Sequence, residues 1–219
     1  MTGYNNISHR FVCALSERWY EETSSLPVGE MTITLDDVAC LLGIPITESV
    51  LHDRELTRDE GIQMMQEDQH FTAEDAAKEV GRQGGAHVSF IKLKRHYKEL
   101  LHRCNQLIEP DTEEEHAEQA EVRMACIKAF LLLLLSYTIF ASKNSRWFNL
   151  MWLLALQGMD ELDSWSWGAM GLPFLFEQLS LTSASSVSSC GGYMTLLVVI
   201  IFFLLDRKCI VVCIILVMI

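Results

Sequence analysis

The chain has 219 residues, and its 17 basic and 29 acidic residues give a net charge of −12. A hydrophobic content of 50% excludes a wholly disordered chain, which needs low hydrophobicity and high net charge. The length suffices for one domain or two small ones with a buried core. The acidic balance argues against a protein whose whole surface binds a phosphate backbone.

The N-terminal third predicts a helix over residues 7–20, in which apolar residues recur every four positions, followed by a small hairpin. Pro27 fits the first central position of a type I turn and Gly29 its last position. Residues 31–35 alternate apolar side chains with threonine, as a half-buried strand does.

A short helix is expected next, because Thr34 and Asp37 have the spacing of a capping box. Gly43 ends this helix and Pro45 prevents its continuation. Such a helix also opens helix-turn-helix units, but residues 47–53 are acidic where a recognition helix would meet phosphates. We therefore interpret it as a structural helix.

Charge then changes sign in blocks along the chain. Residues 48–79 hold ten acidic and three basic residues, and residues 109–121 hold seven acidic residues and no lysine or arginine. The strip Arg82–Arg103 between them holds six basic residues and one acidic residue. We interpret residues 52–88 as a variable acidic insert with a short helix near residues 72–80. The basic strip is either a solvated or internally paired helix face or a nucleic-acid contact, and salt-sensitive binding would distinguish the two.

The second half of the chain predicts a helical bundle. One helix presents an apolar stripe spaced by three and four residues, formed by Phe90, Leu93, Tyr97, Leu100, Cys104 and Leu107. A second helix starts with acidic residues after Pro110 and is almost wholly apolar over residues 129–141. These residues would span about 20 Å, short of a bilayer core of roughly 30 Å, so we expect a central helix that is buried on all sides. Residues 165–179 predict an aromatic-rich helix in which glycine permits close packing.

Residues that could carry chemistry do not gather into a recognisable motif. The seven histidines lack the spacing of metal ligands, and His96, His102 and Cys104 do not share a helix face well. Cys190 has no evident histidine partner, and the seven cysteines, an odd count without a secretory signal, indicate reduced thiols. We therefore predict no catalytic, cofactor-binding or metal site.

One run of sequence nevertheless resembles a known family. LPVGEMTITLDDVA at residues 26–39, followed by LLGIP at 41–45, resembles the opening signature of the plant mobile domain, also called the aminotransferase-like plant mobile domain. Later blocks in the same order support it, at Trp19, Glu22–Thr23, Ala129–Leu132, Trp152–Leu153, Asp160, Trp167–Ala169, Gly191–Tyr193 and Leu196–Leu197. This family includes MAINTENANCE OF MERISTEMS-like and transposon-derived proteins.

The resemblance implies a non-catalytic nuclear protein, a protein-interaction scaffold linked to meristem organisation, genome maintenance or transposon silencing. A pyridoxal enzyme is not expected, because none of the seven lysines follows a phosphate-cradling loop. The metal motifs of the phosphatase domain fused to some members are absent from the sequence. The alternatives are a transposable-element remnant that uses the basic strip to associate with nucleic acid, and a membrane-tethered fragment.

The resemblance ends near residue 197, where the chain becomes apolar apart from Asp206, Arg207 and Lys208. A membrane anchor within residues 187–219 is one interpretation of this tail, and a misjoined reading frame or a core segment are the others. The sequence as a whole predicts a mainly α, helical bundle-like domain with a small N-terminal β-hairpin over residues 7–197, and an aberrant hydrophobic tail over 198–219.

Overall fold

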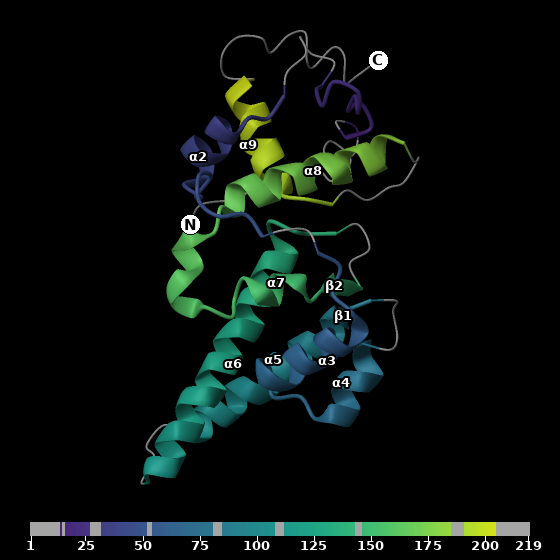
Figure 1. The fold of residues 1–219 in the computed structure, drawn as a ribbon. Coiled ribbons are helices and arrows are strands. Elements are labelled where there is room, and N and C mark those ends of the chain that lie inside the picture. The colour runs from purple at the N-terminus through teal and green to yellow at the C-terminus, as the bar shows by residue number, and fades with distance from the viewer. Residues whose placement is uncertain are drawn as a thin grey trace. The chain divides into compact units, whose positions relative to one another are not determined.

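A computed structural model describes residues 14, 16–26, 32–51, 54–80, 85–107, 112–142, 146–184 and 191–204. The chain forms two compact units. The terminal unit contains residues 1–50, 138–143 and 164–219, and the central unit contains residues 51–137 and 144–163. Both consist mainly of helices (Figure 1), and the described residues contain a single sheet of two antiparallel strands. The predicted mainly α class with a small antiparallel β element is therefore confirmed.

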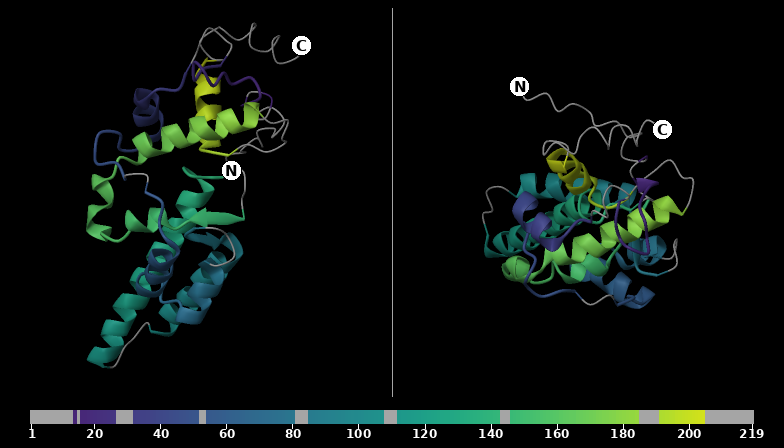
Figure 2. Two further views of the ribbon diagram at one scale, coloured as in Figure 1. Left: turned by 45° about the vertical axis from the view of Figure 1, so that its right-hand side comes forward. Right: turned by 90° about the horizontal axis from the view of Figure 1, so that it is seen from above.

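The terminal unit is built from α2 (Leu35–Leu42), α8 (Trp167–Ser183) and α9 (Met194–Leu204). α2 packs against both of the other helices (Figure 2). The core of this unit is apolar and consists of Trp19, Leu26, Ile33, Val38, Leu172, Leu175, Leu179, Leu196, Leu197 and Val198. Segments from both ends of the chain thus share one core.

α2 begins and ends where the sequence predicts. The Thr34 hydroxyl accepts from the Asp37 backbone N–H at 3.2 Å, and the Asp37 carboxylate accepts from the Thr34 N–H at 2.8 Å. Gly43 follows with φ of 62°, the left-handed conformation that glycine adopts without strain. The capping box and the glycine stop are both confirmed.

Most of residues 7–15 of the predicted helix, and the predicted turn at Pro27–Gly29, lie outside the described residues. Residues 17–20 are described and form a turn and a bridge, so the helix does not reach residue 20 as predicted. The strand predicted over residues 31–35 was also wrong, because residues 32–34 are irregular and Leu35 begins α2.

Immediately before the predicted turn, Tyr20 and Ser25 form an antiparallel bridge with backbone hydrogen bonds of 2.9 and 3.2 Å. The two named strands of the described structure come from elsewhere, because β1 (His87–Ser89) pairs with β2 (Trp147–Asn149). Val88 lies opposite Phe148 in this pairing, and both side chains are buried.

The central unit places its other elements around this ribbon. They are α3 (Arg58–Glu67), α4 (Ala73–Val80), α5 (Phe90–Gln106), α6 (Glu113–Tyr137) and α7 (Met151–Leu154), and the short 3-10 helix η1 (Met159–Ser164) follows. α4 matches the short helix predicted near residues 72–80. The segment interpreted as a variable insert also carries α3 and β1, so it contributes regular structure to the central unit.

Polar side chains lie inside the central unit. Lys128 of α6 pairs with Asp68 at the C-terminal end of α3, and the two side chains are 9% and 10% exposed. The Gln157 side chain donates to the second carboxylate oxygen of Asp68 at 3.2 Å. The buried His96 ring stacks on Phe71 with centroids 3.8 Å apart. The charged pair therefore links α6 to the end of α3 within the core.

Candidate protein-docking surface

The apolar helix α6 has one buried side and one exposed side. Ala125, Ala129 and Leu132 are at most 1% exposed. Five large apolar side chains spaced by three or four residues are 41–60% exposed, namely Met124, Ile127, Phe130, Leu134 and Tyr137. The prediction of a helix buried on all sides was therefore wrong. The C-terminal part of α6, from Ala129 to Tyr137, is almost wholly apolar, but the central unit covers only part of its circumference.

A second row of exposed side chains runs along α5. Leu93 and Leu100 are buried, as the predicted stripe requires, whereas Ile91 is 81% and Leu101 40% exposed. Lys94 lies three residues after Ile91, and Lys98 lies three residues before Leu101. Side chains at this spacing share one face of a helix, so two cations lie between two exposed apolar residues.

Aromatic contacts join the exposed row of α6 to α5. The rings of Tyr97 and Phe130 lie 5.9 Å apart, and those of Phe90 and Tyr137 lie 5.1 Å apart. α5 and α6 pack along each other (Figure 1). Each helix buries the side that faces the core, and we infer that the two exposed rows flank the seam between the helices. We define the α5/α6 face as Ile91, Lys94, Lys98 and Leu101 of α5 with Met124, Ile127, Phe130, Leu134 and Tyr137 of α6.

The basic residues of the predicted strip fall into two groups, those that form an ion pair and those that do not. Lys92 pairs with Asp75 at 3.2 Å, and Arg103 pairs with Glu118. Lys94, Arg95 and Lys98 are exposed, and within the described residues none of them forms an ion pair. The first residue of the strip, Arg82, lies outside the described residues. Uncompensated positive charge therefore lies at and beside the α5/α6 face.

Two thiols meet between α5 and α6, beneath one end of this face. Burial, and then the neighbouring Cys104 thiol, raise the pKa of Cys126 to about 11. The Cys126 thiol is therefore protonated at neutral pH and is a poor nucleophile. This pair serves as packing between the helices rather than as a reactive centre.

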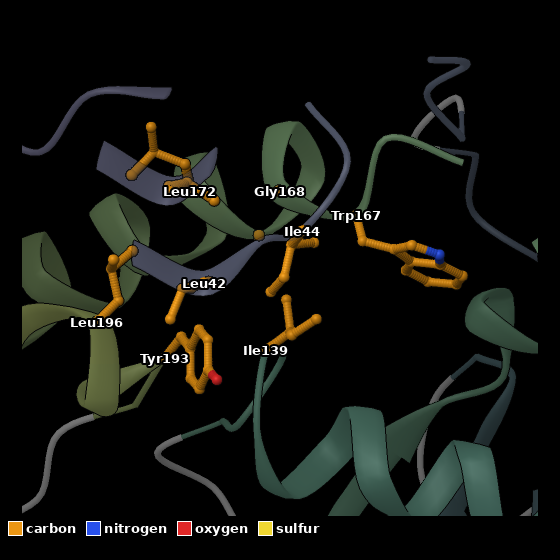
Figure 3. Close-up of a pocket in the computed structure, with 10 residues that line it drawn as sticks. Leu42, Ile44, Ile139, Trp167, Gly168, Leu172, Tyr193 and Leu196 are labelled. Carbon is orange, nitrogen blue, oxygen red and sulfur yellow. The ribbon is translucent and has the colours of Figure 1, made fainter. Parts of the chain in front are cut away.

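The terminal unit holds a small pocket between α2, α8, α9 and residue 139. Its lining is almost wholly apolar, and Figure 3 shows the side chains of Leu42, Ile44 and Ile139 converging while the Trp167 indole points away. Its free volume of about 10 Å³ is close to that of one water molecule. The pocket is too small and too apolar for a substrate with ionisable groups.

The remaining candidate residues do not converge. No group of three or more histidine, cysteine or acidic side chains in the described ranges could hold a metal ion. His96 contacts the Gln69 carbonyl inside the core, whereas His102 is exposed and lies 3.2 Å from Gln106. Cys190 lies outside the described residues.

The C-terminal apolar segment is described only as far as residue 204, within α9. None of the helices in the described ranges combines the length and the apolar character that a membrane crossing requires. The rest of the proposed anchor, including Arg207 and Lys208, lies outside those ranges.

The sequence alone did not reveal the α5/α6 face. From Ala129 to Tyr137 α6 is apolar on nearly every side, so this stretch has no amphipathic pattern that would identify an open side. One signal was available, because Lys128 interrupts the apolar run and its charge would be expected to mark the solvent side. The structure shows the reverse, with Lys128 buried and Phe130 exposed.

Comparisons with protein families and with individual proteins point to the same family. The profile of the plant mobile domain matches residues 1–207. Protein MAIN-LIKE 1 of Arabidopsis thaliana is 30% identical over 197 residues, which cover 89% of this chain and 35% of that protein. Protein MAINTENANCE OF MERISTEMS of the same plant is 26% identical over 200 residues, which cover 90% of this chain and 37% of that protein.

A third relative carries the name of an enzyme. The serine/threonine-protein phosphatase 7 long form homolog of Arabidopsis thaliana is 29% identical over 201 residues, covering 87% of this chain but 13% of that protein. The chain thus spans well under half the length of these curated relatives. No solved structure matches it significantly.

Proposed function

This chain belongs to the plant mobile domain family, and from that premise we propose that it is a non-catalytic nuclear protein that binds other proteins through the α5/α6 face. The name of its relative MAINTENANCE OF MERISTEMS supports a role in meristem organisation. Genome maintenance and transposon silencing are the other processes that the family suggests.

The observation that carries this proposal is the exposed apolar stripe of α6. Soluble proteins rarely leave a contiguous patch of large apolar side chains open to water, and such patches usually mark interaction sites. Phe130 and Tyr137 are 48% and 60% exposed and flank Leu134, which is 45% exposed. Aromatic side chains of this kind are enriched at the centres of protein interfaces.

The non-catalytic part of the proposal is supported by the chemistry of the terminal-unit pocket, which is lined mainly by aliphatic side chains. The phosphatase-named relative does not favour an enzyme, because only 13% of that protein aligns with this chain. Its activity is therefore not carried over.

Site-specific photo-crosslinking tests the proposal directly. A photoreactive amino acid would replace Leu134 in the full chain, and a control would carry it at Lys78, an exposed position on α4. In plant nuclear extract we expect protein adducts from position 134 and far fewer from position 78. The partner protein in each adduct would then be identified and purified, and its affinity would be measured for the unmodified chain and for the Phe130→Ser variant.

A specific partner should bind the Phe130→Ser variant at least about tenfold more weakly than the unmodified chain. Equal affinities, or equal adducts from both positions, would refute docking at this face. A fluorescent fusion of the full chain in plant cells tests the nuclear location, and exclusion from nuclei would refute that part.

Association with nucleic acid is the second candidate. Lys94, Arg95 and Lys98 favour it, because they are exposed and have no ion-pair partner among the residues that the structure describes. It predicts binding to duplex DNA that weakens steeply as salt is raised. Absence of a mobility shift at low salt would eliminate it.

A further inference from the structure

We infer that the α5/α6 face accepts an acidic amphipathic α-helix of a partner protein, an inference that rests on the proposed function and names the chemistry of the partner. The apolar part of that helix would lie along α6, and its carboxylates would lie beside the lysines of α5. Three features of the face point to this occupant.

The first feature is the shape of the apolar stripe. Thirteen residue steps separate Met124 from Tyr137, which corresponds to about 20 Å along the helix axis. Its members recur every three or four residues, the spacing at which the side chains of a second helix interdigitate. A partner helix of about four turns would therefore match the stripe along its length.

The second feature is the one-sided distribution of charge. Lys94 and Lys98 lie four residues apart on α5, in the exposed row across the seam from the stripe. The neighbouring cations Lys92 and Arg103 already have the carboxylates of Asp75 and Glu118 as partners. Carboxylates along one edge of a docked helix would complete the pairing for Lys94 and Lys98.

The third feature is the absence of acidic residues among the nine that define the face, which favours an acidic partner helix over a second copy of the chain. A two-fold symmetric contact would bring the α5/α6 face against itself. None of the nine residues that define this face is acidic, so a second copy would bring lysines to the contact without carboxylates to meet them.

A nucleic acid fits the face less well than an acidic helix. Its phosphates would match Lys94 and Lys98, but the stripe from Met124 to Tyr137 offers aliphatic and partly exposed aromatic side chains over most of the area. Covering these side chains with a charged phosphate backbone would not provide the free energy that burial against apolar surface provides. An amphipathic helix, in contrast, would contact both the apolar stripe and the lysines of α5.

Two designed helical peptides of 21 residues test the inference with the full chain. Both carry the same leucines at alternating spacings of three and four, and one carries glutamate at the flanking positions where the other carries lysine. By fluorescence anisotropy we expect the acidic peptide to bind at least about tenfold more tightly than the basic one at low salt. The preference should shrink as salt screens the charges.

Variants of the chain identify the residues responsible. Leu134→Glu should lower the affinity for the acidic peptide by about 100-fold, because it places a carboxylate in the apolar stripe. The double variant Lys94→Glu/Lys98→Glu should invert the preference toward the basic peptide. Lys78→Glu changes an exposed lysine on α4 and should leave both affinities unchanged. Since all four positions are exposed, hydrogen exchange should show the same protected helices in every variant.

The outcomes separate this inference from the proposed function. Equal or stronger binding of the basic peptide would overturn the inference, as would failure of both peptides to bind. In either case, adducts from position 134 that depend on Phe130 would leave protein docking intact. Light scattering that shows a dimer lost on Leu134→Glu would assign the face to a second copy. DNA binding that is lost in the double lysine variant but kept in Leu134→Glu would assign it to nucleic acid.

Discussion

The terminal unit and the central unit bury their helices in different ways. The terminal unit has an apolar core in which glycines let backbones approach closely. The central unit buries charged side chains, Glu79 and Lys128, and leaves a row of apolar side chains exposed. The first arrangement depends on the volume of each side chain, and the second depends on charge and on what covers the open face.

Glycine contacts show how tightly the terminal unit is packed. A Cβ atom added to Gly171 on α8 would lie 2.5 Å from the Ile139 side chain. One added to Gly168 would lie 2.8 Å from Val38 and from Ile46. Real Cβ atoms do not approach other atoms so closely, so neighbours would have to move.

The buried pair of the central unit has the opposite character. Lys128 and Asp68 neutralise each other in the core, and removal of either side chain would leave the other as a buried, uncompensated charge. Such a pair is a poor source of net stability but a strict requirement for the native arrangement of α3 and α6. The comparison therefore predicts that the two units respond to different substitutions.

The largest expected effect is that of Lys128→Met. It leaves the Asp68 carboxylate buried with only the Gln157 amide beside it, and we expect a loss of about 3–5 kcal/mol. Hydrogen exchange should show lost protection in α3, α5 and α6. The double variant Lys128→Met/Asp68→Leu should recover much of the loss, since no unpaired charge remains. Equal destabilisation by the single and the double variant would contradict this account.

Gly171→Leu tests packing in the terminal unit. The added side chain collides with Ile139, and overpacking of this kind costs about 1–3 kcal/mol. Protection should fall in α2, α8 and α9. The matched control is Gly158→Ala, whose Cβ would meet only the flexible Glu161 side chain, at 3.3 Å, and whose effect should be small. Comparable losses from both changes would argue against close packing of α8.

A matched pair of capping boxes, one taken from each unit, sharpens the comparison at smaller magnitude. Thr34 caps α2 in the terminal unit, and Thr57 caps α3 in the central unit through the same reciprocal bonds with Asp37 and Glu60. Replacing either threonine by alanine should cost about 1 kcal/mol. Each change should reduce hydrogen-exchange protection mainly in its own unit. Equal loss in both units from either change would show that they unfold as one.

The smallest expected effect is a pH dependence confined to the central unit. Burial lowers the pKa of His96 below its ordinary value of 6.5, against opposing contributions from the Gln69 carbonyl and Glu99, while Lys92 and His70 reinforce the shift. The unfolded chain therefore binds the proton more readily, so stability is fully present above pH 6.5 and declines as pH falls toward the lowered pKa.

Denaturant titrations of the chain and of His96→Leu between pH 5 and 8 measure this effect. We expect the unmodified chain to lose stability below pH 6.5 and the variant to lose less over the same interval. Parallel pH profiles would show that His96 does not make this contribution.

Local features of the fold could be predicted from the sequence. The caps of α2 and the apolar stripe of α5 involve residues no more than four positions apart, so their partners are visible in the chain itself. The capping box at Thr57 and Glu60 has the same local spacing, although it lies in the segment interpreted as a variable insert. The family signature at residues 26–45 was equally local.

Tertiary structure alone decided which groups became the core and which the surface. Lys128 and Asp68 lie 60 residues apart, and no local spacing could have paired them. Phe130 and Leu132 are both apolar residues of one helix, yet one is 48% exposed and the other is fully buried. A helix that is apolar all round does not specify its own open side. The part of its circumference that α5 and α7 cover determines that side, and with it the face available to a partner.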